Sequence, residues 1–83
     1  MKVTVRYFAA MREAMGTQVE VLDTPAATLA ELRSALIARG GAGAEALGGN
    51  RAVRMALNQV MSAPDAALSE GCEVAFFPPV TGG

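Results

Sequence analysis

The sequence predicts an α+β fold of two layers, in which one main helix packs on one face of a mixed sheet of about five strands. Three observations lead to this fold class. Alternating apolar residues predict strands toward both ends of the chain, and an apolar stripe at helical spacing predicts one well-defined helix between them. A length of 83 residues allows one small domain, and a hydrophobic content of 52% favours a folded chain over a disordered one.

Residues 2–8 are expected to form the first strand. Val3, Val5 and Tyr7 alternate with polar residues, which is typical of a half-buried strand. Phe8 departs from this pattern, because it places an aromatic ring on the polar face of the strand.

A short helix and a second strand follow. Residues 9–15 predict a helix of one or two turns, and Gly16 is a typical helix stop. Residues 17–22 predict a strand with Val19 and Val21 on the same face. The two strands and their helical connection therefore predict a unit similar to a β-hairpin.

The main helix is the best-specified element of the chain. Thr28 and Glu31 have the spacing of a capping box, in which Glu31 reaches back to the amide of Thr28. Gly40 and Gly41 are expected to end the helix. The apolar stripe consists of Leu29, Leu32, Leu36 and Ile37.

The second half of the chain is expected to complete the sheet. Residues 40–50 are rich in glycine and alanine, so they predict mainly a connection with a short helical turn around 44–47. Asn58 and Gln59 predict a turn between two strands. The three strands expected in this half are residues 52–57, a short return strand at 60–61, and 72–77.

The last strand has two distinct faces. Cys72, Val74 and Phe76 share one face, which favours a buried structural cysteine over a reactive one. Phe77 falls on the opposite face, together with Glu73. It is a second aromatic ring on a face expected to be in contact with water.

The composition excludes several classes of function. The net charge is −1 and no basic cluster exists, so nucleic-acid binding is not expected. The absence of histidine and the single cysteine exclude Ser-His-Asp and Cys-His catalysis and a zinc cage, so no metal is expected. No signal peptide and no apolar stretch of roughly 18 residues is present, so we expect no membrane association. Without an internal disulfide, the chain suits a reducing cytoplasm.

A protruding tail is expected after the last strand, which divides the chain into a domain at 1–77 and a flexible tail at 78–83. Pro78 and Pro79 cannot donate to a strand ladder and favour an extended backbone. Six extended residues reach roughly 20 Å, enough to enter a deep pocket. The remaining tail residues are small or lack a side chain: Val80, Thr81, Gly82 and Gly83.

The order of elements matches the β-grasp fold of ubiquitin-like proteins, and three segments resemble the small subunit of molybdopterin synthase. The segment 71–83 (GCEVAFFPPVTGG) carries most of the resemblance. The segment 7–16 (YFAAMREAMG) matches the opening strand and helix of that family, and 57–59 (LNQ) matches one of its turns.

This resemblance implies a sulfur carrier in molybdenum-cofactor biosynthesis. A ubiquitin-activating-like adenylyltransferase would use ATP to adenylate Gly83, and a sulfur donor protein would convert the acyl-adenylate to a thiocarboxylate. Gly82 would give the tail clearance and flexibility. The carried sulfur would pass to a cyclic pyranopterin precursor in the large synthase subunit, within a heterotetramer. The resemblance therefore implies a subunit without catalytic side chains or a permanently bound cofactor, and not an autonomous enzyme.

The two aromatic rings on polar faces predict a partner surface. In a β-grasp sheet the first and last strands are neighbours, so Phe8 and Phe77 should form one exposed patch. The alternative is that both rings fill a secondary core under the tail. The resemblance adds Met61 to the surface that faces the large subunit. It also implies that the tail enters this subunit through Pro78, Pro79, Val80 and Thr81.

Other polar side chains are expected to have no catalytic role. Arg12 and Glu13 match the family pattern, and Arg51 and Arg54 lie in a second segment of the chain. The sequence does not indicate which surface arginines steer a partner. All four are expected to be solvated charges.

Two other functions use the same tail chemistry as far as the adenylate. One is a sulfur carrier for thiamine synthesis or RNA thiolation. The other is a ubiquitin-like modifier whose terminal glycine is conjugated to lysines of other proteins.

Overall fold

Five strands form one mixed sheet in the computed structural model, which describes residues 1–49 and 52–79. The spatial order is β2-β1-β5-β3-β4; β1 and β5 are parallel, and the other neighbours are antiparallel. The predicted α+β fold with neighbouring first and last strands is therefore confirmed. The strands are β1 Lys2–Tyr7, β2 Val19–Asp23, β3 Arg54–Leu57, β4 Val60–Met61 and β5 Glu73–Phe77.

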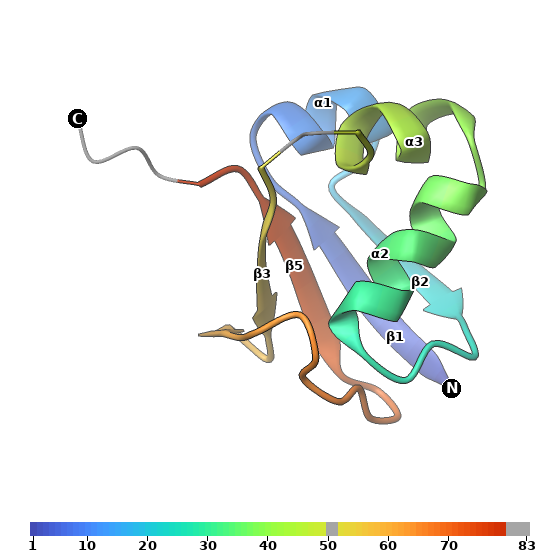
Figure 1. Cartoon of the computed structure of the whole chain (residues 1–83), viewed down its shortest axis with the longest axis vertical. Coiled ribbons are helices and arrows are strands. Elements are labelled where there is room, and N and C mark those ends of the chain that lie inside the picture. Colours follow the sequence, from blue (N-terminus) through green and yellow to red (C-terminus); the bar gives the residue numbers. More distant parts are fainter. Residues whose placement is uncertain (50–51, 80–83) are drawn as a thin grey trace.

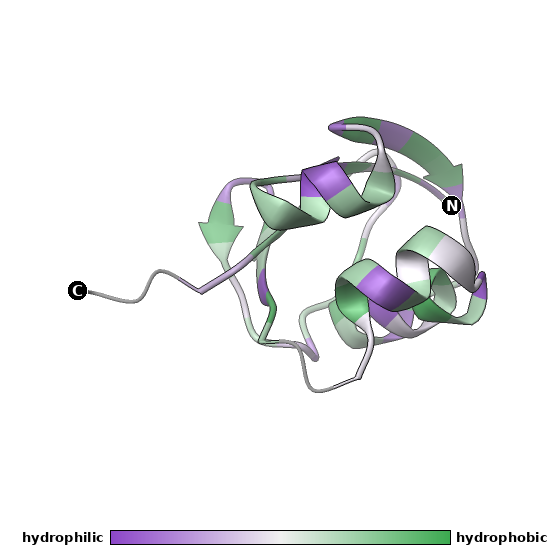
Figure 2. Ribbon diagram, turned by 90° about the horizontal axis from the view of Figure 1, so that it is seen from above, coloured by the Kyte–Doolittle hydropathy of each residue, from purple (hydrophilic) through white to green (hydrophobic). Residues whose placement is uncertain are grey.

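Within the described residues, three helices lie on one side of the sheet (Figure 1). They are α1 Ala10–Met15, α2 Leu29–Ala38 and α3 Gly41–Leu47. In Figure 1, α2 crosses in front of the sheet, and α1 and α3 lie together near the end where β1 and β5 finish. The helices are mostly hydrophobic or neutral with a few hydrophilic segments (Figure 2), because few of their residues are charged.

The segment expected to be mainly a connection is a seven-residue helix, α3, so that prediction was wrong. The sequence signal was weak because glycine lowers helix propensity. Tertiary packing overrides this weakness, since Ala46 and Leu47 are buried. Gly43 allows the approach to α2: a Cβ at this position would lie 2.2 Å from the carbonyl oxygen of Leu36.

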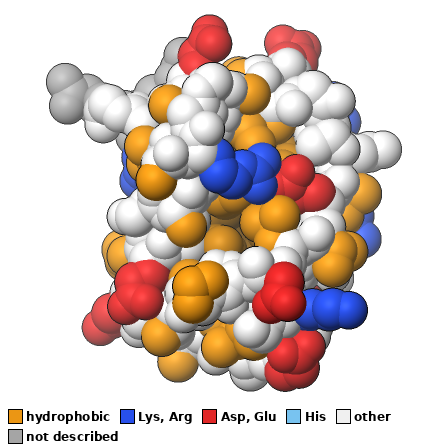
Figure 3. Space-filling view, turned by 90° about the vertical axis from the view of Figure 1, so that its right-hand side faces the viewer, with side chains coloured by type: hydrophobic (Ala, Val, Ile, Leu, Met, Phe, Trp, Pro, Cys, Tyr) orange, Lys and Arg blue, Asp and Glu red, His pale blue; other side chains and the backbone are white. Residues whose placement is uncertain are grey.

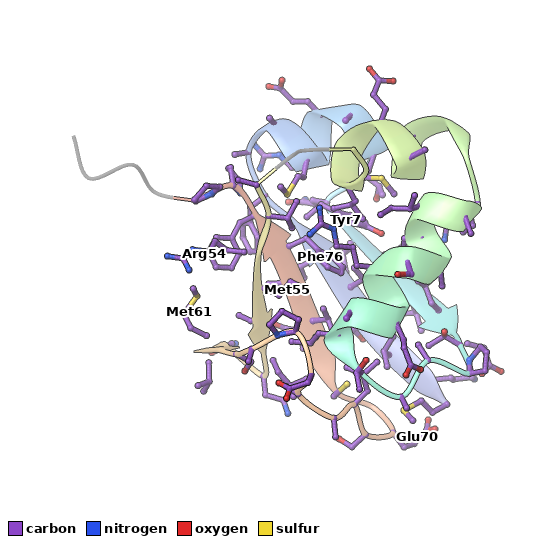
Figure 4. All side chains as sticks on the ribbon, viewed as in Figure 1. Tyr7, Arg54, Met55, Met61, Glu70 and Phe76 are labelled. Carbon is purple, nitrogen blue, oxygen red and sulfur yellow. The ribbon has the colours of Figure 1, made fainter. Side chains whose placement is uncertain are left out.

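The core lies between the helices and the inner face of the sheet. Val3, Val5 and Tyr7 of β1 are buried there, as their alternation predicted. The rings of Tyr7 and Phe76 stack with centroids 6.2 Å apart. Figure 4 shows Tyr7, Phe76 and Met55 between the sheet and the helices.

The main helix begins at the predicted cap but with a different second hydrogen bond. The Thr28 hydroxyl accepts from the amide of Glu31 at 3.2 Å. The Glu31 carboxylate accepts from the amide of Ala27 at 2.9 Å, and not from Thr28 as the capping-box spacing predicted. The buried stripe of Leu29, Leu32 and Leu36 is confirmed.

Several strands are shorter than expected for local reasons. β1 ends at Tyr7 because the chain turns at Ala9, whose φ is 53°. β2 begins at Val19 because the Thr17 hydroxyl donates to the Val19 carbonyl at 3.0 Å and holds a local turn. β3 begins at Arg54, and residue 51 lies outside the described residues.

Candidate functional site

The side of the sheet that faces away from the helices is called the open face. Strand residues alternate between faces, so the partners of Arg6 in neighbouring strands lie on the same face as Arg6. One row of paired residues crosses all five strands on this face: Val19, Arg6, Ala75, Ala56 and Met61. Figure 4 shows Arg54 and Met61 pointing away from α2, which agrees with this assignment.

Two aromatic rings meet on the open face, where β1 and β5 end. The rings of Phe8 and Phe77 contact edge to face, with centroids 6.5 Å apart and planes at 87°. Phe8 is 45% exposed and Phe77 is half-buried, so neither ring belongs to the buried core. The predicted neighbourhood of the two rings is confirmed, and the secondary-core alternative is wrong for Phe8.

Backbone geometry holds Phe8 in this position. The Phe8 amide donates to the Phe76 carbonyl at 3.1 Å, which extends the pairing of β1 with β5 by one residue. The Phe8 carbonyl then accepts from the amide of Met11, at the start of α1. Ala9 between them has a positive φ, a conformation that costs free energy in a residue with a Cβ. Backbone hydrogen bonds to β5 and to α1 therefore determine where the Phe8 ring lies.

The rings border two open hollows that together form one surface. The larger hollow is lined by Arg6, Phe8, Ala56, Gln59, Met61, Glu73, Ala75 and Phe77. The smaller and more apolar hollow is lined by Phe8, Ala9, Ala75, Phe77 and Pro78. We call Phe8, Met61, Phe77, Ala56 and Ala75 the open-face patch.

A tight turn positions Met61 at the border of this patch. Asn58 and Gln59 both have positive φ, 50° and 68°, as in the turns that favour asparagine between paired strands. The Asn58 side-chain oxygen accepts from the amide of Glu73 at 2.9 Å, and the Asn58 amide donates to the Glu73 carbonyl at 2.8 Å. The hairpin is thereby attached to β5. Met61, which is 54% exposed, lies opposite Ala56.

One ion pair lies beside the open-face patch. Arg6 Nε is 3.1 Å from a Glu73 carboxylate oxygen, and both residues line the larger hollow. The sequence placed both residues on polar faces of their strands, but it did not predict that they meet. Arg54 is exposed opposite Phe77. Arg12 and Glu13 are also exposed, as expected, on α1.

The tail is described only at its beginning. Pro78 and Pro79 are half-buried and follow the central strand β5, so the chain leaves the sheet beside the Phe8 and Phe77 rings. The expected roles of Val80, Thr81, Gly82 and Gly83 fall on residues outside the described part of the chain. Those roles stay predictions, as does the division into a domain and a tail.

A second polar cluster lies on the inner side of the sheet. The Tyr7 hydroxyl donates to the Glu20 carboxylate at 3.0 Å, and Arg39 forms an ion pair with the same oxygen at 3.0 Å. Burial, reinforced by the negative charge of Glu20, raises the pKa of Tyr7 well above its usual value. This cluster joins β1, β2 and the end of α2, and it does not reach the open-face patch.

The remaining reactive and charged groups do not form a site. Cys72 is 3% exposed, so its predicted burial is confirmed. Residues 1–49 and 52–79 contain no group of three or more potential metal ligands. In the same residues, no helix has the length and hydropathy needed to span a membrane. On the side of the molecule drawn in Figure 3, acidic and basic side chains occur in small groups between hydrophobic and neutral ones.

A family model and a curated relative both match nearly the whole chain. The ThiS family model matches residues 5–83. A molybdopterin synthase sulfur carrier subunit from Escherichia coli is 38% identical over 81 residues, which is 98% of this chain and 99% of the relative.

Two solved structures share the fold over the whole of both chains. One belongs to a protein–protein complex of subunits 1 and 2 of the molybdopterin-converting factor from Helicobacter pylori, with 28% identity and a TM-score of 0.69. The other is SAMP1, a small archaeal modifier protein from Haloferax volcanii, with 26% identity and a TM-score of 0.75.

Proposed function

The chain belongs to the ThiS family, and from this premise we propose that it is the sulfur-carrier subunit of a molybdopterin synthase. The observation that carries the proposal is the full-length similarity to the Escherichia coli subunit of that name. The shared region includes nearly all of the chain, and therefore both the open-face patch and the tail.

The proposed chemistry takes place at the carboxyl group of Gly83. A carboxylate is a poor acyl donor, so a ubiquitin-activating-like adenylyltransferase first joins it to AMP from ATP, with release of pyrophosphate. Sulfide released by a sulfur donor protein then attacks the carbonyl carbon and AMP leaves, which produces a thiocarboxylate with no change in oxidation state. The absence of a side chain at Gly82 and Gly83 keeps the path to this carbonyl open. ATP is bound by the activating enzyme, and the carrier needs no permanent cofactor.

The proposed acceptor is a cyclic pyranopterin precursor bound to the large synthase subunit. The open-face patch would dock on that subunit while residues 78–83 enter its active site. The structure supports this arrangement because β5 ends beside the patch, so the tail begins where the partner would bind. The Helicobacter pylori complex supports a large-subunit partner, and we propose a cytoplasmic heterotetramer with two carriers flanking a dimer of large subunits.

Intact-mass measurement tests the proposal. The chain is incubated with ATP, the adenylyltransferase and a sulfur source, and we expect a mass gain equal to the replacement of one oxygen by sulfur. A variant with one extra residue after Gly83 is the matched control and should gain no mass. A wild-type mass that stays unchanged, or a loaded chain that produces no molybdopterin with the large subunit, would contradict the proposal.

The second candidate is a protein modifier, which the similarity to SAMP1 favours. In that case the adenylated Gly83 would form an isopeptide bond with lysines of other proteins. Cell lysate probed for the chain would then show a ladder of larger adducts. Under the carrier proposal we expect mainly the free form. A carrier for thiamine synthesis or RNA thiolation would load sulfur equally well but would not support molybdopterin formation.

A further inference from the structure

The Arg6–Glu73 ion pair borders the open-face patch and lines the same hollow as the patch residues. Arg6 pairs with Val19 of β2 on one side and with Ala75 of β5 on the other. The hollow around the ion pair is bordered by the apolar side chains of the patch. A partner that covers the patch would therefore also cover these two charges.

Covering this ion pair has an electrostatic consequence. The side chains of Arg6 and Glu73 are 46% and 27% exposed, so water now solvates both. Removing this water is unfavourable unless new hydrogen bonds replace it. Within the described residues, the Glu73 contact through Nε is the one ion pair of Arg6, and a guanidinium has further N–H donors. A partner that satisfies these donors is favoured over one that presents only apolar atoms.

The charge of the surface indicates the kind of group that fits. Arg54 lies on the same face, exposed and opposite Phe77, and points away from the helices (Figure 4). Arg6 and Arg54 contribute two positive charges and Glu73 one negative charge, so this region has a net charge of +1 (2 − 1), although the whole chain has −1. A negatively charged acceptor is complementary to this region.

We propose that Arg6 determines partner specificity, and that the large synthase subunit places a carboxylate against the free N–H groups of its guanidinium. Glu73 contacts the guanidinium through Nε, and the Arg6 side chain is 46% exposed, so a partner on this face can reach it. This inference rests on the proposed function, because the large subunit is the occupant of the open face.

Reversing the charges of Arg6 and Glu73 tests whether the partner requires a positive charge at position 6. Binding to the purified large subunit is measured by calorimetry for wild type, for Arg6→Glu, and for the double variant Arg6→Glu/Glu73→Arg, which keeps an internal ion pair but reverses it. We expect the dissociation constant to rise about tenfold or more in both variants. Urea unfolding shows whether each variant is folded. If Arg6→Glu does not fold, the double variant alone decides the outcome.

Lys2→Glu is the matched control. It changes the net charge by the same amount on the same face, but four residues along β1, about 13 Å from Arg6. We expect a much smaller change in affinity than for Arg6→Glu. An equal loss for Lys2→Glu would indicate a general effect of charge and would overturn the inference.

Two other results would overturn the inference but would leave the proposed function unaffected. One is wild-type affinity in the double variant, which would mean that only the internal ion pair matters. The other is unchanged affinity in a folded Arg6→Glu variant. A wild-type chain that fails to bind the large subunit would instead contradict the proposed function itself.

Discussion

The rings of Phe8 and Phe77 meet edge to face on the open side of the sheet, with centroids 6.5 Å apart, although they come from opposite ends of the domain. The contact exists because β1 and β5 are parallel neighbours, so both strands end at the same edge of the sheet. Aromatic pairs in this geometry contribute about 0.5–1.5 kcal/mol beyond their buried area. The contact therefore stabilises the positions of both rings on the apolar surface beside the start of the tail.

Replacing Phe77 by Asp should weaken binding to the large subunit while the domain stays folded. The half-buried ring is on the open face, so its loss removes an aromatic contact without opening the core. We expect the dissociation constant to rise about tenfold or more, measured by calorimetry. Val21→Asp, on the same face at the outer strand β2, is the control and should bind nearly as wild type does. Unfolding of Phe77→Asp would show that this ring belongs to the core.

The Tyr7 hydroxyl should make stability depend on pH in the alkaline range. Its folded-state pKa is raised above the unfolded value, so the folded chain retains this proton at pH values where the unfolded chain loses it. The contribution is complete below the unfolded pKa of about 10 and is lost as the pH rises toward the folded pKa.

Urea unfolding of wild type and Tyr7→Phe between neutral pH and pH about 11 measures this effect, and we expect a flatter profile for the variant. Tyr7 is the single tyrosine, so ultraviolet absorbance reports its ionisation directly. Ionisation of the native chain at the pKa of free tyrosine would contradict the burial of the hydroxyl beside Glu20.

Gly43→Ala should destabilise the fold through a clash. The added Cβ would lie 2.2 Å from the Leu36 carbonyl oxygen, which belongs to the backbone of α2 and cannot rotate away. We expect a loss of about 1–3 kcal/mol in the free energy of unfolding, as for overpacked sites. The exposed neighbour Ala42→Ser is the control, with a change within about 0.5 kcal/mol. Equal stability of the two variants would show that α3 does not pack closely on α2.

Cys72 should be inert in the folded chain. Its side chain is buried with Val74 and Phe76, so a thiol reagent should react slowly in native buffer and rapidly in urea. We expect Cys72→Ala to lower the free energy of unfolding by about 1 kcal/mol, as for loss of one small buried group. Sulfur loading at Gly83 should be unchanged in that variant. Lost loading in a folded Cys72→Ala chain would instead assign the sulfur to Cys72.

Local patterns were sufficient to predict most of the elements. The alternation in β1 and β5, the Thr28 cap and the leucine stripe of α2 act over a few residues, so they can be recognised without a structure. The prediction failed for α3 because its glycines disfavour a helix and offset the helix preference of its alanines. That helix forms because Ala46 and Leu47 pack into the core and Gly43 permits close contact with α2.

Side-chain alternation was sufficient to predict the strand faces, the burial of Cys72 and the position of Phe8 on the polar face, because it is a property of each strand alone. The contact of Arg6 with Glu73 and the attachment of the hairpin to β5 through Asn58 could be found only in the folded sheet. These contacts join strands that are distant along the chain. Their register depends on how the whole sheet packs against the helices, and no single segment encodes that register.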